Sequence, residues 1–381
     1  MTELVVNGIT SGDEMVLNMG PHHPSTHGVL RFVLHTDGEI VRSAVPDVGY
    51  LHRSIEKIGE RVTMTQFMPY TDRVDYLAAM FCNEVWAMSV EKLLGVEPPR
   101  RAQVLRCIAA ELNRIISHLI GLGTMAMDLG AFTPFVQAMR EREFVNDFLE
   151  HLCGARLTYN YCRVGGVCCD IPNEAWIKQV RLWTEHFLPM VDELDRLVTA
   201  NDIFIKRCIN IAVVSPSEAI NWGFVGPNLR ASGVKHDVRR DIPYGIYPEL
   251  TFDVPVGTGE KGTLGDCYDR FVVRVKEMRE STRMVQQALQ LLEETQDTSI
   301  RAELPKKIKP QGEAYTRVES ARGDLGCYVV ATGDDKAYRV RFRTGSFTAV
   351  AIIESRSPGM FVADIVALIS SLDVVAPEID R

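Results

Sequence analysis

The sequence predicts an α+β fold that is mainly helical, with a multi-helix bundle core and small antiparallel β elements near both ends of the chain. Three observations support this prediction. Long segments, such as 72–94 and 100–127, repeat apolar residues at helical spacing. Short apolar runs flank Asp37-Gly38, a strong hairpin pattern. A later segment, 315–347, alternates apolar and polar residues around Gly333, which predicts a second small sheet.

The composition is that of an ordinary globular protein. The chain has 381 residues, of which 46% are hydrophobic, and a net charge of −8. An acidic balance argues against a nucleic-acid partner. The first residues lack a basic stretch followed by an apolar one, so we expect no signal peptide. Nine scattered cysteines without a Cys-x-x-Cys pair suit a reducing compartment and predict that the chain itself binds no metal.

Residues 115–135 are almost wholly apolar, which raises the question of a membrane span. A spanning helix needs about 20 apolar residues. This stretch is interrupted by His118 and Asp128, and an acid inside a bilayer is costly. We therefore expect a core helix that runs into a turn, with Asp128 near its exit.

The remaining elements follow from periodicity and from turn residues. Residues 15–48 are expected to form the first antiparallel sheet. Asp72 is a suitable N-cap for the first long helix and Gly95 a suitable end, while Thr133-Pro134 and Gly154 bound a later one. Helices are expected at 72–94, 100–127, 133–153, 173–200, 266–295 and 361–372. Residues 230–265 are rich in Gly and Pro and predict an ordered loop or short hairpins.

We expect these elements to form a single domain over 1–381. Within it, 1–50 holds the N-terminal antiparallel β element, and 51–300 holds the helical core with its Gly/Pro-rich loop at 230–265. Residues 313–381 hold the C-terminal β element, a helix and a tail. No internal repeat or composition break divides the chain.

A histidine-rich loop, Gly20-Pro21-His22-His23-Pro24-Ser25-Thr26-His27-Gly28, is the first candidate for chemistry. His23 and His27 have the spacing of a helical zinc pair, but Pro24 and the flanking glycines favour a turn. A β-turn whose imidazoles cap backbone groups is a second interpretation. The third is a loop that presents a histidine as a proton donor, since imidazole titrates near neutral pH.

For two further groups of polar residues, a structural role is expected before a functional one. Tyr76, one turn into the predicted helix that Asp72 caps, fits a core aromatic with a satisfied hydroxyl. Glu111, Arg114 and His118 follow at spacings of three and four and share one helical stripe. On so apolar a helix the stripe faces the interior, where charges persist when they are paired. Structural ion pairing is therefore expected, and a buried acid beside a cavity is the functional alternative.

Several blocks, in order along nearly the whole chain, resemble one known family. The chain resembles the 49 kDa-type (D-type) subunits of the proton-pumping NADH:quinone oxidoreductase, respiratory complex I. The blocks are 20–31, 49–53, 69–76, 90–95, 111–118, 128–135, 230–233, 319–326 and 379–381. Two positions depart from the family pattern: His22 stands where Gln is common, and Pro377 stands where Gly is frequent.

This family shares its fold with the large subunit of nickel–iron hydrogenases, in which two cysteine pairs hold the metal. The equivalent segments here are 70–76 and 371–377, and neither contains a cysteine. Thiolate ligation of nickel and iron is thus impossible at both. By the resemblance, the vacated metal pocket is a quinone headgroup site.

The resemblance also implies roles for individual residues. Quinone reduction takes two electrons and two protons, so hydrogen-bond donors must meet the carbonyl oxygens. His27 and Tyr76 would be the two headgroup partners. Asp128 would pair with His27, favouring and orienting its charged form. Thr124 and Met125 would line the cavity.

The same resemblance implies the partners and the setting. The chain alone would bind no cofactor; quinone would be the substrate, and electrons would come from a [4Fe–4S] cluster in the adjacent small (B-type) subunit. Arg53 would lie near that cluster and tune its potential. The C-type subunit, and the H-type membrane subunit at the quinone entrance, would be further partners. The location would be peripheral, on the cytoplasmic side of the cell (inner) membrane.

The function implied is that of a core component in a translocase, which couples quinone reduction to proton translocation. The alternative is a metal-free, hydrogenase-like scaffold in a related membrane complex with another donor, such as ferredoxin. A hydrogen-using enzyme is nearly excluded by the missing cysteines.

Overall fold

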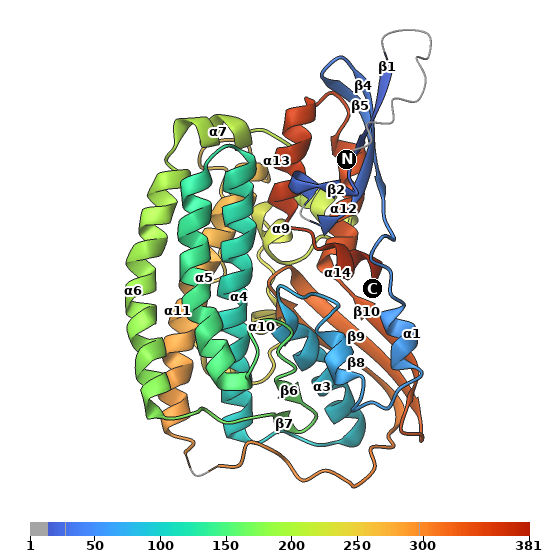
Figure 1. The fold of residues 1–381 in the computed structure, drawn as a ribbon, viewed down its shortest axis with the longest axis vertical. Coiled ribbons are helices and arrows are strands. Elements are labelled where there is room, and N and C mark those ends of the chain that lie inside the picture. Colours follow the sequence, from blue (N-terminus) through green and yellow to red (C-terminus); the bar gives the residue numbers. More distant parts are fainter. Residues whose placement is uncertain (1–13, 27, 297) are drawn as a thin grey trace.

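Four long helices stand side by side in the left half of the molecule (Figure 1). The computed structural model describes residues 14–26, 28–296 and 298–381. The four helices are α4 (Arg100–Asp128), α5 (Phe132–Cys153), α6 (Glu174–Val198) and α11 (Cys267–Glu293). α4 is buried along most of its length because it packs against α5 and α11 on one side and against α3 (Ala79–Leu94) and α13 (Val362–Leu372) on the other.

A three-stranded antiparallel sheet near the N-terminus lies at the upper right of Figure 1. Its strands are β1 (Glu14–Met19), β4 (Arg31–Asp37) and β5 (Ile40–Asp47), in the order β1-β4-β5. The turn between β4 and β5 begins at Gly38, whose φ of 58° suits glycine. The hairpin expected at Asp37-Gly38 is thus confirmed. Between β1 and β4 the chain forms a small excursion of β2 (His22–His23), the 3₁₀ turn η1 (Pro24–Thr26) and β3 (Gly28–Val29).

The second antiparallel sheet, at the lower right, is also confirmed. It consists of β8 (Gln311–Ser320), β9 (Gly323–Thr332) and β10 (Ala337–Arg343), in the order β10-β9-β8. Helix α3 packs on β8 and β9, and the short helix α1 (Ile55–Gly59) packs on β10. The sheet therefore holds the chain that precedes α4 in place.

The C-terminal helices fill the space between the N-terminal sheet and the bundle (Figure 1). α12 (Gly345–Arg356) packs on β5, while α13 packs on α4 and α11. The last helix is α14 (Ala376–Asp380). The remaining short elements are α2 (Met68–Thr71), β6 (Cys162–Arg163), β7 (Gly166–Val167), α7 (Asp202–Cys208), α8 (Pro216–Asn221), α9 (Gly226–Ala231), α10 (Val238–Asp241) and η2 (Tyr247–Glu249).

The mainly helical α+β class is confirmed, and most helix ends fall where the sequence places them. Gly95 and Gly154 end α3 and α5 in the left-handed conformation. Asn173 and Asp266 cap α6 and α11 through their side chains. α5, however, begins earlier than Thr133, at Phe132, so the proline lies inside its first turn.

The predicted start of the first long helix at Asp72 is wrong. α3 begins at Ala79, and residues 72–78 form an irregular connection from α2. Asp72 is buried and accepts a hydrogen bond from the Asn160 backbone at 3.0 Å, so its carboxylate is committed to a distant loop. Asp75 instead accepts the backbone N–H groups of Leu77 and Ala78, at 3.0 and 3.1 Å. Tertiary contacts have overridden the local cap pattern.

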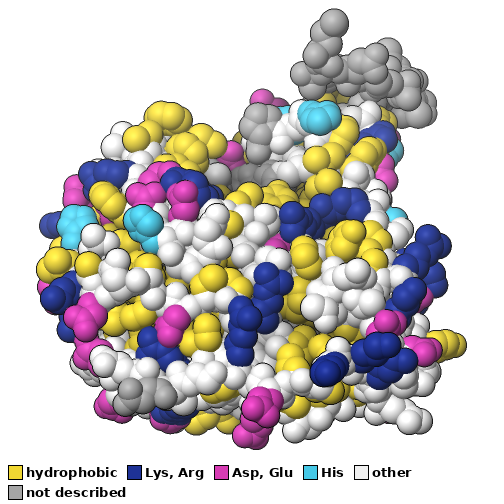
Figure 2. Space-filling model, turned by 60° about the horizontal axis from the view of Figure 1, so that its bottom comes forward, with side chains coloured by type: hydrophobic (Ala, Val, Ile, Leu, Met, Phe, Trp, Pro, Cys, Tyr) yellow, Lys and Arg dark blue, Asp and Glu magenta, His cyan; other side chains and the backbone are white. Residues whose placement is uncertain are grey.

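The expectation of a loop or hairpins over 230–265 is partly wrong, because this stretch carries two helical turns. Asp237 caps α10 by accepting from the Arg239 backbone at 2.9 Å, and η2 follows with Pro248 in its turn. Within the described part of the chain, no helix combines the length and apolarity needed to cross a bilayer. Figure 2 shows Lys, Arg, Asp and Glu side chains mixed over the lower face of the molecule.

Candidate functional site

The end of α4 is the first component of the candidate site. Asp128, its last residue, is half-buried and accepts a 2.6 Å hydrogen bond from the hydroxyl of Ser370 on α13. The turn η1 of the histidine loop also packs on α13. His27 lies outside the described residues. The structure therefore brings the neighbours of His27 and the predicted carboxylate to the same helix.

Thr124 lies one turn before Asp128, so the two side chains share a face of α4. The Thr124 hydroxyl donates to the carbonyls of Ile120 at 2.8 Å and Gly121 at 3.1 Å, so it is bound to its own helix. Thr124 is half-buried, whereas Met125 is only 1% exposed and belongs to the hydrophobic core.

The histidine loop is closed by its own hydrogen bonds. The Ser25 backbone donates to His23 Nδ1 at 3.2 Å. The buried Thr26 hydroxyl bridges the carbonyls of His23 and Gly28, at 2.8 and 2.9 Å. For His23, the interpretation as an imidazole that caps a backbone group is confirmed. The loop backbone is thereby fixed on both sides of His27.

Tyr76 lies in the irregular segment between α2 and α3, not inside a helix as expected. It is half-buried, and its hydroxyl has no hydrogen-bond partner among the described residues. Burial, followed by the charge of Asp75, raises the pKa of Tyr76, while Arg322 and Arg53 oppose the rise. The phenol therefore stays protonated at neutral pH and is available as a hydrogen-bond donor.

Arg322 joins two cysteine-free segments, 70–76 and 371–377. Its Nη1 donates to Asp75 Oδ2 at 3.0 Å and to the Ser117 hydroxyl at 2.9 Å. Its Nη2 donates to Asp373 Oδ1 at 3.4 Å. All four side chains are buried. Segment 70–76 and segment 371–377 thus meet across one guanidinium, beside Tyr76.

The end of α13 is held rigidly by a second arginine. Asp373 ends this helix with a φ of 51°. Arg274 donates to the carbonyls of Ser371 at 2.7 Å and Leu372 at 3.2 Å, and its Nε lies 3.8 Å from Asp373. Burial lowers the pKa of Arg274 to about 10, against the opposing charge of Asp373. The guanidinium is therefore still charged at neutral pH.

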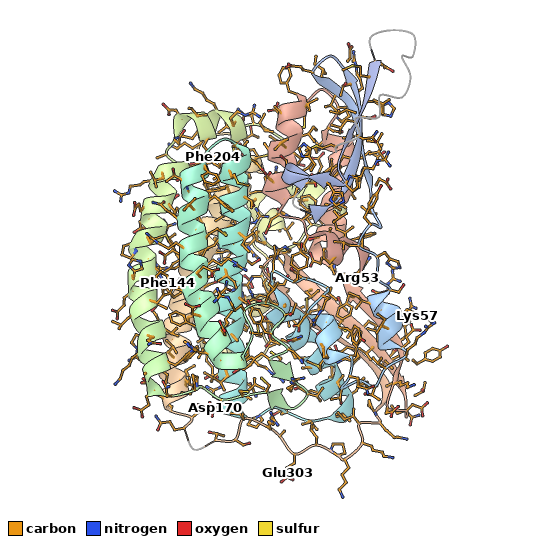
Figure 3. The ribbon with its side chains drawn as sticks, viewed as in Figure 1. Arg53, Lys57, Phe144, Asp170, Phe204 and Glu303 are labelled. Atoms are coloured by element: carbon orange, nitrogen blue, oxygen red, sulfur yellow. The ribbon has the colours of Figure 1, made fainter. Side chains whose placement is uncertain are left out.

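Arg53 is exposed and lies next to the start of α1, where it is labelled in Figure 3. Its Nη2 donates to the carbonyl of Arg73 at 2.6 Å, three residues before Tyr76. Its positive charge favours the ionised form of Tyr76. The Arg53 guanidinium thus lies at the surface and also binds the backbone that leads to Tyr76.

Asp380, near the C-terminus, binds the segment that directly precedes Arg53. The Asp380 carboxylate accepts the backbone N–H groups of Gly49 and Leu51, at 2.8 and 2.7 Å. His52 Nδ1 lies 2.6 Å from the Asp380 carbonyl. Two sequence blocks that are 328 residues apart therefore form one structural unit.

The stripe of Glu111, Arg114 and His118 is a structural ion-pair network, as expected. Glu111 pairs with Arg114 at 3.0 Å and with Arg239 at 3.1 Å. Its pKa is lowered to about 2 because these cations, with hydroxyl donors, outweigh its burial. His118 Nε2 lies 2.8 Å from Glu277, and burial lowers the pKa of this histidine. The stripe lies within the core.

Ser370, Asp373 and Arg322 were not singled out from the sequence. Arg322 falls inside the block 319–326 that carries the family resemblance, so a role could have been suspected there. Asp373 lies in the segment 371–377 that the resemblance marks, but neither Asp373 nor Ser370 carries a local pattern of its own, and only the fold brings them to Arg322 and Asp128. Among the residues that the structure describes, no group of three or more His, Cys, Asp or Glu side chains is placed to hold a metal ion.

Comparison with known proteins gives a consistent result. Residues 128–309 and 303–381 match the family described as the respiratory-chain NADH dehydrogenase 49 kDa subunit. The chain is 65% identical over 374 residues to the second D-type NADH-quinone oxidoreductase subunit of Sorangium cellulosum, covering 98% of this chain and 96% of the relative.

Two further relatives extend the comparison. The chain is 60% identical over 383 residues to the first D-type subunit of Anaeromyxobacter sp., covering all of both chains. It is 47% identical over 371 residues to the D-type subunit of Chlorobaculum tepidum, covering 97% of this chain and 92% of the relative. This similarity over the full length, together with the matching family model, shows that the chain belongs to the 49 kDa (D-type) subunit family of NADH-quinone oxidoreductases, the respiratory complex I enzymes.

Proposed function

We propose that this complex I subunit forms the quinone headgroup site of its complex, with His27 and Tyr76 as the two hydrogen-bond partners of the quinone carbonyls. Asp128 would orient His27, and Thr124 and Met125 would line the site. The observation that carries the proposal is the 2.6 Å hydrogen bond from Ser370 to Asp128, on the helix against which the histidine loop packs. The Asp128 carboxylate and the histidine loop are thus both attached to α13.

The chemistry of the residues supports this assignment. Reduction of a quinone to a quinol adds two electrons and two protons, and negative charge develops on the carbonyl oxygens. A protonated phenol donates a hydrogen bond to one oxygen, and the raised pKa of Tyr76 keeps that proton in place at neutral pH. An imidazole beside a carboxylate is a suitable proton donor for the other oxygen.

The rigidity of the surroundings also favours a binding site. Arg322 fixes the backbone before Tyr76 through Asp75, and Arg274 fixes the end of α13 that carries Ser370. Groups held in this way lose little freedom when a ligand binds. The protein would therefore present its donors in place before the quinone arrives.

Electrons would come from a [4Fe–4S] cluster in the adjacent small (B-type) subunit, on the side of exposed Arg53. The C-type subunit, and the H-type membrane subunit at the quinone entrance, are the other neighbours that we propose. The chain would bind no cofactor of its own. It would sit at the periphery of the cell membrane on the cytoplasmic side, and quinone reduction there would drive proton translocation by the complex.

The experiment replaces His27 in the intact complex. His27→Ala should lower NADH:quinone turnover by at least about 100-fold, the usual contribution of a positioned proton donor, while electron flow from NADH to an artificial acceptor persists. His35→Ala, on the exposed face of β4, is the matched control and should keep both activities.

A second variant separates a catalytic site from a scaffold. Asp128→Asn preserves the shape of the side chain but removes its charge, so quinone turnover should fall while assembly is retained. Full quinone turnover in both His27→Ala and Asp128→Asn would show that the headgroup binds elsewhere and would favour the scaffold alternative.

A further inference from the structure

Cys168 and Cys169 differ from the other cysteines of the chain. Six of the nine are buried: Cys82, Cys107, Cys162, Cys208, Cys267 and Cys327. Cys169 is exposed, and Cys168 next to it is half-buried. Their Sγ atoms lie 3.5 Å apart. The chain thus presents two neighbouring thiols, at least one of them accessible, on the same side of a loop.

Hydrogen bonds hold the backbone of this loop at both cysteines. Cys168 follows β7 and donates its N–H to the Tyr161 carbonyl at 2.9 Å. The Cys168 carbonyl accepts from Arg301 Nη2 at 2.5 Å, and the Cys169 carbonyl accepts from the Tyr161 hydroxyl at 3.2 Å. Asp170, labelled at the lower end of the helices in Figure 3, is bound at 2.8 Å by Arg101. The two Cα atoms are therefore fixed in place, and the Sγ atoms lie 3.5 Å apart in the absence of any ligand.

The geometry disfavours a disulfide between the two cysteines. Adjacent Cα atoms lie about 3.8 Å apart across a trans peptide. An ordinary disulfide needs Cα atoms at least about 4.4 Å apart and sulfurs at about 2.05 Å, so a bond between neighbours is strained and easily reduced. Burial, with the thiol of Cys169 next to it, raises the pKa of Cys168 to about 12, which keeps this sulfur protonated.

The same spacing suits a single atom bound by both sulfurs. Two sulfurs that share a soft atom at about 2.3 Å each lie roughly 3.3 to 3.8 Å apart, for bond angles from about 90° to tetrahedral. The observed 3.5 Å falls inside this range. Soft centres prefer thiolate ligands over nitrogen and oxygen donors.

The number of protein ligands available then decides which soft atom the two sulfurs can bind. A structural zinc ion takes four protein ligands, and a catalytic one takes three. Among the described residues no third Cys, His, Asp or Glu side chain completes such a group, and Asp170 is occupied by Arg101. Trivalent arsenic is three-coordinate, so an organic arsenical needs two sulfurs only, its third bond being the one to carbon.

We propose that Cys168 and Cys169 form a dithiol site that captures trivalent arsenicals. An arsenoxide, R–As=O, condenses with both thiols to give R–As(S)₂ and one molecule of water. Two As–S bonds form, the two S–H bonds and the As=O bond are lost, and both thiol protons leave with the oxygen. No electron is transferred, so the reaction needs no oxidant or reductant.

The experiment titrates the reduced full-length chain with phenylarsine oxide and reads the intact mass and the apparent affinity. We expect one adduct per chain, which a small dithiol removes and a monothiol at the same concentration does not. Cys169→Ser and Cys168→Ser should each weaken binding by about 100-fold, because the second thiol then no longer acts intramolecularly.

Cys153→Ser is the matched control. Cys153 is also half-buried and is close enough for its charge to affect Cys168, but its thiol donates to the Leu149 carbonyl at 3.0 Å on α5. This variant should bind phenylarsine oxide as the parent chain does. The proposal is overturned if no stoichiometric adduct forms, if Cys169→Ser binds as tightly as the parent, or if Cys153→Ser abolishes binding.

Discussion

The guanidinium of Arg322 lies 3.0 Å from the carboxylate of Asp75, and both side chains are buried. The two residues are 247 positions apart in the sequence. Because Asp75 immediately precedes Tyr76, this ion pair fixes the segment on which the proposed hydrogen-bond donor stands. It also links that segment to Asp373 at the end of α13.

Replacement of Arg322 should therefore be costly. Arg322→Met leaves Asp75 and Asp373 buried without their shared cation, so we expect a loss of about 3 to 5 kcal/mol in the free energy of unfolding. Arg339→Met is the matched control, since this arginine is exposed and pairs with Glu60 at 3.2 Å. The control should cost less than about 1 kcal/mol. Denaturant unfolding of the full chain measures both, and equal losses would contradict the structural role of Arg322.

Two glycines of α4 give a graded test of packing near the site. A Cβ on Gly121 would lie 2.8 Å from the Asp373 carboxylate, whereas one on Gly123 would lie 3.3 Å from the Ala138 methyl. Both substitutions by alanine gain about 1 kcal/mol of helix propensity. Gly121→Ala should nevertheless destabilise the chain by about 1 to 3 kcal/mol, because Asp373 must shift.

Gly123→Ala is the matched control for this clash. It should leave the melting temperature nearly unchanged or raise it. A melting temperature that rises equally in both variants would show that the Asp373 side chain can move away from the new methyl group without loss of stability.

Glu84 predicts a pH dependence of stability. This side chain of α3 is 4% exposed, and burial, with Glu91 and Glu111 nearby, raises its pKa to about 7 although Arg106 opposes the rise. An acid whose pKa is raised on folding contributes stability below its unfolded pKa, about 4.3, and loses it progressively as the pH rises from there through about 7.

Glu84→Gln stays neutral at every pH and should not show this loss. Relative to the parent chain, the variant should gain roughly 2 kcal/mol between pH 5 and pH 8. Denaturant unfolding at the two pH values measures the difference. Glu97→Gln, on the exposed surface nearby, is the control and should follow the parent chain. Parallel curves for Glu84→Gln and the parent would contradict the raised pKa.

The position that we propose for Arg53, beside a [4Fe–4S] cluster of the small subunit, predicts an effect on that cluster. Loss of a positive charge near a cluster makes its reduction less favourable, so Arg53→Ala should lower the midpoint potential of the adjacent [4Fe–4S] cluster by tens of millivolts. Redox titration of the cluster signal in the intact complex measures this shift. Lys57→Ala, at an exposed lysine of α1 that is paired with Glu60, serves as the control. A larger shift of the midpoint potential in Lys57→Ala than in Arg53→Ala would show that the cluster lies closer to Lys57 than to Arg53.

The sequence was sufficient for the elements that depend on local patterns. Asp37-Gly38 placed a hairpin, and Gly95 and Gly154 placed helix ends, because turn and cap residues act on the backbone within a few positions. The paired stripe of Glu111, Arg114 and His118 was predictable in the same way, since its spacing shows that the three charges share one buried face.

What the sequence missed depends on contacts between distant segments. Asp72 has the features of a helix cap, but its carboxylate accepts a hydrogen bond from the Asn160 backbone. Helix α3 begins at Ala79 instead. Ser370 has no pattern of its own and matters because α13 packs on α4. The residues proposed for the quinone site came from a family resemblance, since periodicity alone favoured a core role for Tyr76.

The most direct measurement is quinone turnover by the Tyr76→Phe complex, with Tyr70→Phe as the matched control. Tyr70 lies six residues earlier and is 40% exposed. Removal of the Tyr76 hydroxyl leaves the ring in place, so assembly and electron transfer to an artificial acceptor should be unchanged in both variants. We predict that NADH:quinone turnover falls at least about 10-fold in Tyr76→Phe only. Equal turnover in the parent, Tyr76→Phe and Tyr70→Phe complexes would contradict a quinone headgroup site at Tyr76.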